Sequence, residues 1–346
     1  MMSSALGSEN KARPRRDQFT GCLIGQCLGD ALGFPMEGHS TEVCGVYASE
    51  TLSDKSFSGP EKASSFGQYS DDSQLARELI QSFVSCKEFK PSDYALRIAS
   101  IFKEGRIIGY GRSTQEAAFR LIEGVPWENA GTPAPAAGNG SAMRAAPIGL
   151  IFCDDMENMI QAAQDQGRIT HQDKRCSAGA VCIAGAVSLV LRSHPIDRKA
   201  FLRTLAGWTG RIETSLSEGL EQLVDWVDLA SEDVSNLLYE KGLAPDLKEN
   251  GGLPPFVTGT VLWSIYSFLK SPRKYIKTIS TAISVGGDVD TTAAMAGAIS
   301  GAYLGIEAIP LHLSRSLNDR GTWTMEELVN LANECFELKV GGSKTG

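Results

Sequence analysis

Glycine recurs at every fourth position in the first apolar segment of this chain, and this spacing restricts how the segment can pack. The surrounding apolar residues fall at helical spacing, and the glycines share one face of the predicted helix: Gly21, Gly25, Gly29 and Gly33. Each glycine destabilises a helix by about 1 kcal/mol relative to alanine. That cost is tolerable where another helix or a ligand approaches the backbone closely. We therefore expect a close neighbour along this face.

Helical periodicity continues through most of the chain. The pattern predicts helices over residues 75–84, 94–103, 176–191, 256–269, 275–283 and 325–338, and an acidic amphipathic pair within 212–250. Residues 40–68 show no strong period and are interpreted as a long loop, and Asp154-Asp155 is interpreted as a helix cap. No segment alternates as a strand would. The sequence predicts an all-α protein with one large domain.

Composition is that of a soluble globular protein and excludes several partners. Of the 346 residues, 42% are apolar and 21% are charged. The net charge of -8 argues against a binder of phosphate backbones, and the longest apolar runs fall short of the ~20 residues of a membrane span. Eight cysteines without a C-x-x-C pair indicate a reducing compartment. With no signal peptide visible in residues 1–17, we expect a cytoplasmic protein that binds neither nucleic acid nor membrane.

Two short segments concentrate carboxylates and hydroxyls. They are residues 286–292, which contain Asp288, Asp290 and Thr291, and residues 70–73, which contain Ser70, Asp71 and Asp72. Carboxylates this close cannot all stay ionised cheaply, and a hard divalent cation is the usual partner of an all-oxygen cluster. Four carboxylates match two Mg2+ ions, with Mn2+ as the alternative. A bimetal site orients substrate hydroxyls and activates water, which indicates hydrolysis of an oxygen-rich, phosphate-bearing substrate.

A structural explanation competes with each of these signals. Serine and aspartate are preferred N-cap residues, so a lone Ser-Asp-Asp-Ser before a helix is more often a cap than a ligand set. The turn of residues 138–141 leaves backbone N–H groups open to an anion, but Asn-Gly is also an ordinary turn. A lone histidine before a small-residue helix, as at His171, is more often a capping or core residue.

Four motifs in order resemble the ADP-ribosylglycohydrolase family over about residues 19–338. They are Gly21-Cys-Leu-Ile-Gly with Gly29-Asp-Ala-Leu-Gly, then Ser70-Asp-Asp-Ser, then Gly138-Asn-Gly-Ser-Ala-Met-Arg, and finally Gly287-Asp-Val-Asp-Thr-Thr. The resemblance implies a single-domain orthogonal multi-helix bundle over residues 18–340, after a flexible basic extension of residues 1–17. It also implies a dinuclear magnesium site at the floor of an ADP-ribose cleft. The implied reaction is hydrolysis of the bond between ribose C1″ and a protein side chain.

The resemblance assigns roles residue by residue. The implied metal ligands are Ser70, Asp71, Asp72, Asp288, Asp290 and Thr291. The implied substrate-binding residues are Gly109, Tyr110, Gly138, Asn139, Gly140, Ser141, Met143 and His171, and the implied catalytic residues are Glu37, Asp71 and Asp72. The family commonly has threonine where Ser70 and Ser73 stand, and serine keeps the ligating hydroxyl. Asp30 is left outside the site, as a residue that supports the ligands or packs the helix.

The segments 29–37 and 109–114 are similar to the bacterial branch that includes the dinitrogenase reductase-activating glycohydrolases. This likeness implies that the cut linkage is ADP-ribosyl-arginine, with serine- or O-acetyl-linked ADP-ribose as alternatives. A non-catalytic binding protein of the same fold and a phosphohydrolase that cuts the pyrophosphate are the rival functions. Some relatives protect bacteria from ADP-ribosyltransferase toxins, and the basic tail is hypothesised to hold such a toxin.

Overall fold

The computed structural model describes residues 13–52, 66–245 and 251–342. These residues form α-helices, two short 3₁₀ helices and the loops between them. The strand-like contacts among them are isolated bridges between single pairs of residues. The all-α fold expected from the sequence is confirmed.

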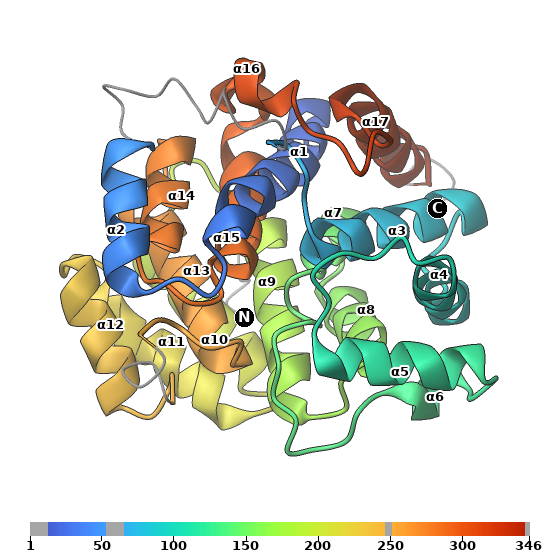
Figure 1. Cartoon of the computed structure of the whole chain (residues 1–346), viewed down its shortest axis with the longest axis horizontal. Helices are drawn as coiled ribbons and strands as arrows, with labels where there is room; N and C mark the ends of the chain where they lie inside the picture. Colours follow the sequence, from blue (N-terminus) through green and yellow to red (C-terminus); the bar gives the residue numbers. More distant parts are fainter. Residues whose placement is uncertain (1–12, 53–65, 246–250, 343–346) are drawn as a thin grey trace, which may run out of the picture.

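Four helices form the core, and nearly every residue in them is buried. They are α1 (Arg16–Gly33), α9 (Lys174–Val190), α13 (Val257–Lys270) and α15 (Val289–Leu304). Their sequences are apolar or small on almost every side, and a helix of that kind belongs inside a protein. Figure 1 shows α1 and α15 running together through the middle of the molecule.

The remaining helices pack around these four. On one side of the molecule lie α2 (Thr41–Glu50), α14 (Tyr275–Ile283), α10 (Arg198–Thr209), α11 (Thr214–Trp226) and α12 (Ser231–Glu240) (Figure 1). On the other side lie α3 (Asp71–Cys86), α4 (Pro91–Lys103), α5 (Arg112–Ile122), α6 (Trp127–Ala130), α7 (Ala146–Ile151), α8 (Met156–Arg168) and α17 (Met325–Gly342). The short helices η1 (Phe34–Met36), η2 (Ile306–Ala308) and α16 (Leu311–Ser314) complete the set among the described residues.

The glycine face of α1 lies against α15, backbone to backbone. A Cβ added at Gly21 would lie 2.4 Å from the carbonyl oxygen of Gly301. One added at Gly25 would lie 2.5 Å from the carbonyl oxygen of Gly297. Real Cβ atoms do not approach a backbone so closely, so only glycine fits. The close neighbour predicted from the spacing is therefore a helix.

The loop predicted over residues 40–68 is partly wrong, because its first part is helix α2. Ser40 caps this helix, and its side chain accepts a hydrogen bond from the backbone N–H of Val43. Only Cys44 and Ala48 of α2 are buried, so the helix lacks the apolar stripe by which helices are recognised in a sequence. Residues 53–65 lie outside the described residues.

The first helix begins at Arg16, inside the predicted extension of residues 1–17. Arg15 forms an ion pair with Asp17, and Arg16 forms one with Glu337 of α17. Arg16, a basic residue of the predicted extension, therefore contacts the folded domain. Residues 1–12 lie outside the described residues, so the expected flexibility of the extension stays a prediction there.

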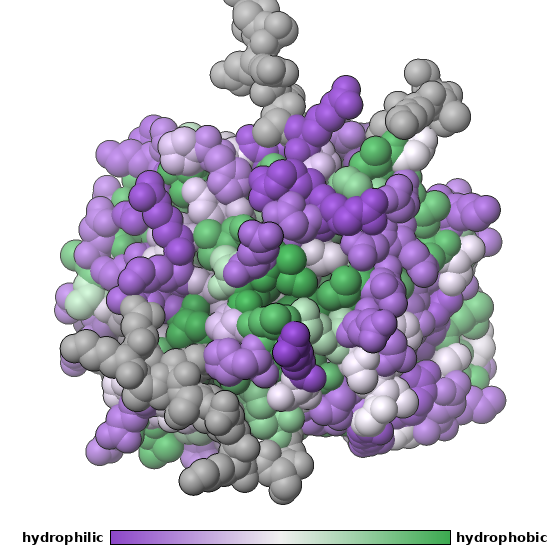
Figure 2. Space-filling model, turned by 90° about the horizontal axis from the view of Figure 1, so that it is seen from above, coloured by the Kyte–Doolittle hydropathy of each residue, from purple (hydrophilic) through white to green (hydrophobic). Residues whose placement is uncertain are grey.

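The surface seen from above is mainly hydrophilic, with hydrophobic residues gathered near the centre of this face (Figure 2). Such residues are normal on a soluble protein, because polar groups cannot cover a whole molecule. Across the described part of the chain, every helix is too short or too polar to cross a bilayer.

Candidate functional site

One open cavity of about 530 Å³ gathers most of the residues singled out in the sequence. Seven separate segments line it, and the predicted residues among its walls are Glu37, Asp71, Asp72, Gly109, Tyr110, Gly138, Asn139, Gly140, Met143, His171, Asp288, Asp290 and Thr291. Ser70 and Ser141 do not line it. The hydroxyl of Ser141 donates to the carbonyl of Cys176, 2.9 Å away, and is fully buried. The side chain of Ser141 therefore braces the turn beside the cavity.

The N-terminus of α3 supplies two of the carboxylates. Ser70 is its N-cap, and the Ser70 hydroxyl lies 3.0 Å from Oδ2 of Asp72, to which it donates. The backbone N–H of Asp71 donates to the carbonyl of Ile108 at 2.7 Å, so the helix start is tied to the segment that leads to Gly109. Ser70 therefore caps the helix, and the cap places the Asp71 and Asp72 carboxylates at the cavity. The metal-ligand role of residues 70–72 stays a prediction.

The N-terminus of α15 supplies the other two. Asp288 is its N-cap, and the side-chain amide of Asn139 donates a short hydrogen bond to Oδ2 of Asp288. The Thr291 hydroxyl donates to Oδ2 of Asp72 at 3.2 Å, which joins the two helix starts directly. Two helix N-termini therefore point their positive ends at one carboxylate cluster, and this offsets part of its self-repulsion.

The chemistry of this cluster fits a divalent cation. The carboxylates form two groups of three, and within each group one oxygen of every residue lies within 4.8 Å of the others. The first group is Asp30, Asp72 and Asp290, and the second is Glu37, Asp288 and Asp290. Oδ1 of Asp72 is buried without a hydrogen-bond partner, which is costly unless a ligand satisfies it. Burial raises the pKa of Asp72 well above the ordinary aspartate value, and the nearby Asp30 raises it further.

Asp71 belongs to neither group of three, although the resemblance makes it a metal ligand. It lines the same cavity. Burial raises the pKa of its carboxyl well above the usual range, and Asp290 is the next cause. The same two influences, burial first and then a neighbouring carboxylate, Asp72, raise the pKa of Asp290. Asp71 is therefore part of the same charge cluster.

Asp30 is the residue that sequence reasoning left outside this centre. It is fully buried in α1, and its two oxygens accept from the backbone N–H groups of Ser70, at 2.9 Å, and Ser73, at 3.1 Å. Asp30 thus caps α3 from another helix. Burial raises its pKa to about 6. The sequence did offer one signal for Asp30, because it is a single carboxylate inside an apolar helix. Such a group is rarely buried without a partner, so a partner could have been expected.

Glu37 stands at the mouth of the cavity, just after η1. The neighbouring Gly38 donates its backbone N–H to the carbonyl of Gly287 at 2.9 Å, and Gly287 donates to the carbonyl of His39 at 2.8 Å. These bonds place Glu37 beside Asp288. Partial burial raises the pKa of Glu37, and the Asp288 charge adds to the shift. A carboxyl in this position is suited to exchange a proton with a bound ligand.

The turn of residues 138–140 also lines the cavity and packs on the ring of His171. A Cβ added at Gly140 would lie 2.8 Å from Cε1 of His171, and one at Gly138 would lie 3.3 Å from its Nε2. Glycine at both positions lets the ring reach the cavity wall. Burial lowers the pKa of His171 to about 3, and the charge of Arg144 acts in the same direction. The imidazole is therefore neutral at physiological pH.

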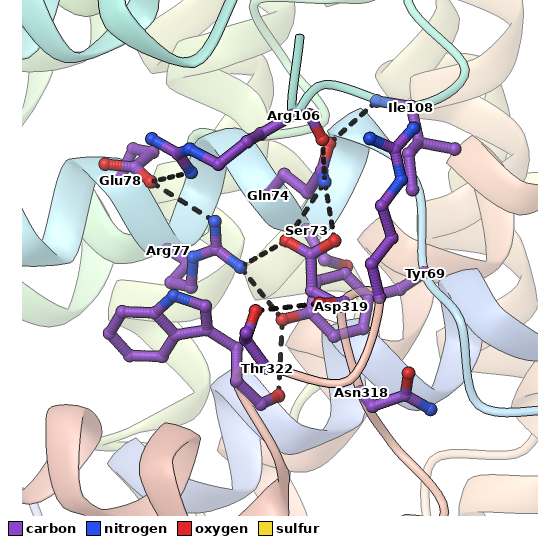
Figure 3. A network of polar contacts seen from close by, with 12 residues as sticks. Tyr69, Ser73, Gln74, Arg77, Glu78, Arg106, Ile108, Asn318, Asp319 and Thr322 are labelled. Carbon is purple, nitrogen blue, oxygen red and sulfur yellow. Dashed lines mark hydrogen bonds and ion pairs between the residues drawn. The ribbon is translucent and has the colours of Figure 1, made fainter. Parts of the chain in front are cut away.

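A buried polar network, which sequence reasoning did not detect, holds α3 from behind (Figure 3). Arg77, fully buried, forms an ion pair with Asp319 at 2.7 Å and donates to the Tyr69 hydroxyl at 3.1 Å. Gln74 donates to both oxygens of Asp319 and to the carbonyl of Arg106, and its own oxygen accepts from the backbone of Ile108. The network ties the helix of Asp71 and Asp72 to the segment before Gly109.

Fold and site together define an all-helical protein whose buried carboxylate centre lies at the floor of an open cavity. The model of the family "ADP-ribosylglycohydrolase" matches residues 11–343. The chain belongs to the ADP-ribosylglycohydrolase family, which confirms the resemblance seen in the motifs.

Named relatives share about a quarter to a third of their residues with this chain. "ADP-ribosylhydrolase ARH3" of Gallus gallus is 29% identical, over 97% of this chain and 97% of its own. The protein of the same name from Homo sapiens is 30% identical, over 85% and 87%. "ADP-ribosylarginine hydrolase Tri1" of Pseudomonas putida (strain GB-1) is 23% identical, over 93% and 78%. A solved "ADP-ribosylglycohydrolase-related protein complex" has a TM-score of 0.71 at 26% identity, covering 95% of this chain and 100% of that one.

Proposed function

We propose that this protein hydrolyses the glycosidic bond at C1″ of an ADP-ribose group attached to a protein side chain, with divalent cations bound at the carboxylate centre. The observation that carries the proposal is the convergence of Asp72, Asp288 and Asp290 on one cavity floor, with one oxygen of Asp72 buried and unsatisfied. A buried acidic centre without a cation would be self-repelling. Membership of the ADP-ribosylglycohydrolase family supplies the substrate class.

The residues proposed to hold two Mg2+ ions, or Mn2+ in their place, are Ser70, Asp71, Asp72, Asp288, Asp290 and Thr291. When bound, such ions orient substrate hydroxyls and lower the pKa of a water molecule. Asp30 holds the start of α3 through two backbone hydrogen bonds and so keeps Asp71 and Asp72 facing the cavity. Asn139 holds the Asp288 carboxylate through a hydrogen bond from its side-chain amide.

The rest of the cavity is proposed to receive the ADP-ribose. The Gly138 to Gly140 turn and the neutral His171 offer uncharged donors to the substrate. Met143 provides an apolar wall, and Gly109 and Tyr110 form part of the rim. Glu37, at the mouth, is proposed to exchange the proton that the leaving group needs.

For the leaving group we propose the side chain of arginine, because the exposed carboxylate of Glu37 lines the cavity and favours a guanidinium. The name of the Pseudomonas putida relative supports this choice. The relatives named ARH3 share more residues with this chain and their name specifies no linkage, so serine- or O-acetyl-linked ADP-ribose is the second candidate. An ADP-ribosylated protein is the proposed partner. The suggested contact of the N-terminal extension with an ADP-ribosyltransferase toxin rests on the basic composition of residues 1–17 and on the family resemblance.

The test is incubation of the full chain with arginine-, serine- and O-acetyl-linked ADP-ribose, with Mg2+ or with a chelator. We expect free ADP-ribose, formed fastest from the arginine linkage and only with the metal. Release of AMP would replace the proposal by a phosphohydrolase. Binding of ADP-ribose without turnover of any linkage would instead indicate the non-catalytic function.

Two variants separate chemistry from folding in this test. Asp290→Ala is expected to abolish turnover while the helical content is retained. Asp228→Asn serves as the matched control, because the Asp228 side chain is 84% exposed and pairs with Arg198 far from the cavity residues. Full activity of Asp290→Ala in the presence of chelator would contradict the metal model.

A further inference from the structure

Arg144 is a buried cation without an ion-pair partner. Its guanidinium is fully buried, and it makes no salt bridge with a carboxylate of the described residues. Its Nε donates to the side-chain oxygen of Gln166 at 3.0 Å, and its Nη2 donates to the Gln166 carbonyl at 2.9 Å. Burying an unpaired charge is expensive, so the position calls for an explanation beyond packing.

The second hydrogen of the same Nη2 reaches Thr170. The Thr170 hydroxyl oxygen accepts this bond at 2.7 Å, and it also lies 2.8 Å from Nδ1 of His171. Thr170 is fully buried, and its hydroxyl proton has no other described acceptor. Both Nη2 hydrogens and the Thr170 hydroxyl proton find acceptors only if Arg144 donates to the hydroxyl and the hydroxyl donates to Nδ1. In that arrangement Nδ1 carries no proton.

A neutral imidazole has one ring proton, which must then be on Nε2. This nitrogen faces the Gly138 to Gly140 turn, and His171 lines the cavity. Gln166 fixes the same region from the other side, since its side-chain amide donates to the carbonyl of Ser141 at 2.8 Å. The chain of donors thus begins at a buried guanidinium and ends at a hydrogen-bond donor on the cavity wall.

We propose that Arg144 and Thr170 are positioning residues that fix His171 as the Nε2–H tautomer, so that the ring presents a donor to an acceptor oxygen of the ligand in the cavity. The inference deepens the proposed function, because the oxygen it would meet belongs to the phosphates or ribose hydroxyls of ADP-ribose. The charge of Arg144 polarises the relay without entering the cavity. His171 contributes a neutral hydrogen-bond donor, and Arg144 sets the strength of that donor through Thr170.

The test reads the tautomer directly. In the full chain labelled with 15N-histidine, long-range proton–nitrogen NMR spectra distinguish the protonated ring nitrogen from the bare one. The signals of His171 are assigned by their loss in His171→Gln. We expect Nδ1 bare and Nε2 protonated at neutral pH. An imidazolium or an Nδ1–H tautomer in the unaltered chain would overturn the proposal.

Variants at Thr170 test the relay itself. Thr170→Val removes the hydroxyl at nearly constant volume, and we expect Nδ1–H to appear and the affinity for ADP-ribose to fall about tenfold. Thr170→Ser keeps the hydroxyl and is expected to keep both the tautomer and the affinity. Thr209→Val is the control for burial, because Thr209 is also fully buried but bonds only within α10.

The outcomes separate this inference from the proposed function. An unchanged tautomer in a folded Thr170→Val would show that the relay does not set it. If the chain shows the expected tautomer but hydrolyses no ADP-ribosyl bond, the relay is supported and the proposed hydrolase activity is rejected. Binding is followed by calorimetry with free ADP-ribose, so neither reading depends on turnover.

Discussion

Gly33, the last residue of α1, lies directly against the Cα of Asp290 in the first turn of α15. A Cβ on Gly33 would lie 2.5 Å from that atom. The contact ends the row of glycines that begins at Gly21, so the packing of two core helices determines where a carboxylate of the cavity floor stands. Close packing and the carboxylate centre are one feature of this fold.

Gly33→Ala should therefore disturb the centre as well as the core. The added methyl must displace the backbone of Asp290, and overpacking of this kind costs about 1–3 kcal/mol. We expect a lower free energy of unfolding and a weaker stabilisation by Mg2+, both measured by thermal unfolding. Gly207→Ala is the control, since Gly207 is exposed in α10 with no atom near its Cβ position. It should stabilise the chain by up to about 1 kcal/mol.

Replacing Asp30 by asparagine should destabilise the start of α3. Asp30 uses both oxygens for two backbone N–H groups, and asparagine offers one oxygen and one amide that repels the second N–H. We expect a loss of about 1–3 kcal/mol in chemical denaturation. At Asp197 a single oxygen accepts both N–H groups of the cap of α10. Asp197→Asn should accordingly be close to neutral, and equal effects at both sites would contradict the cap role of Asp30.

The stability of the metal-free chain should fall as the pH rises. Burial raises the pKa of Asp71, Asp72 and Asp290 in the folded state, so above about pH 4 the folded chain holds protons that the unfolded chain has released. A folded state that binds more protons loses stability with increasing pH. In chelator, the melting temperature should decline as the pH is raised from about 4, where an ordinary aspartate titrates, to neutral.

Mg2+ should reverse this decline, because it binds the ionised carboxylates. At a hundred times its dissociation constant it would add about 2.7 kcal/mol, with the larger gain at neutral rather than acidic pH. Asp290→Asn should lose this gain, whereas Asp228→Asn should retain it. A melting temperature in chelator that increases with pH would show that the cluster is not self-repelling.

Removing Asp319 should be among the most destabilising single changes in the chain. Asp319→Ala leaves the fully buried Arg77 with only Glu78 as an ion-pair partner, at 3.2 Å, and frees Gln74 from its anchor. Breaking a buried pair on one side costs about 3–5 kcal/mol. The exposed pair of Arg211 and Glu157 is the comparison, and Glu157→Gln should change the denaturation midpoint little. If the Asp319→Asn variant is studied at a temperature where the variant is folded, and Mg2+ no longer stabilises it, the network also positions Asp71.

Some elements could be read from local pattern alone. The helix predicted over residues 275–283 has the bounds of α14, and Asp155 caps α8 as predicted. Helix α2 was missed because it buries only Cys44 and Ala48. A helix that covers another helix with two small side chains leaves no periodic signal in its sequence.

The sequence by itself determined the all-helical class, the glycine contact face, and the two carboxylate segments that belong together chemically. These follow from periodicity and from the charge of neighbouring residues, which are local properties. Only the tertiary structure decided that Asp30 caps α3, that Ser141 braces its turn rather than lining the cavity, and that Arg144 reaches His171 through Thr170. Such hydrogen bonds are made by single atoms of residues brought together by packing, and no spacing along the chain encodes them.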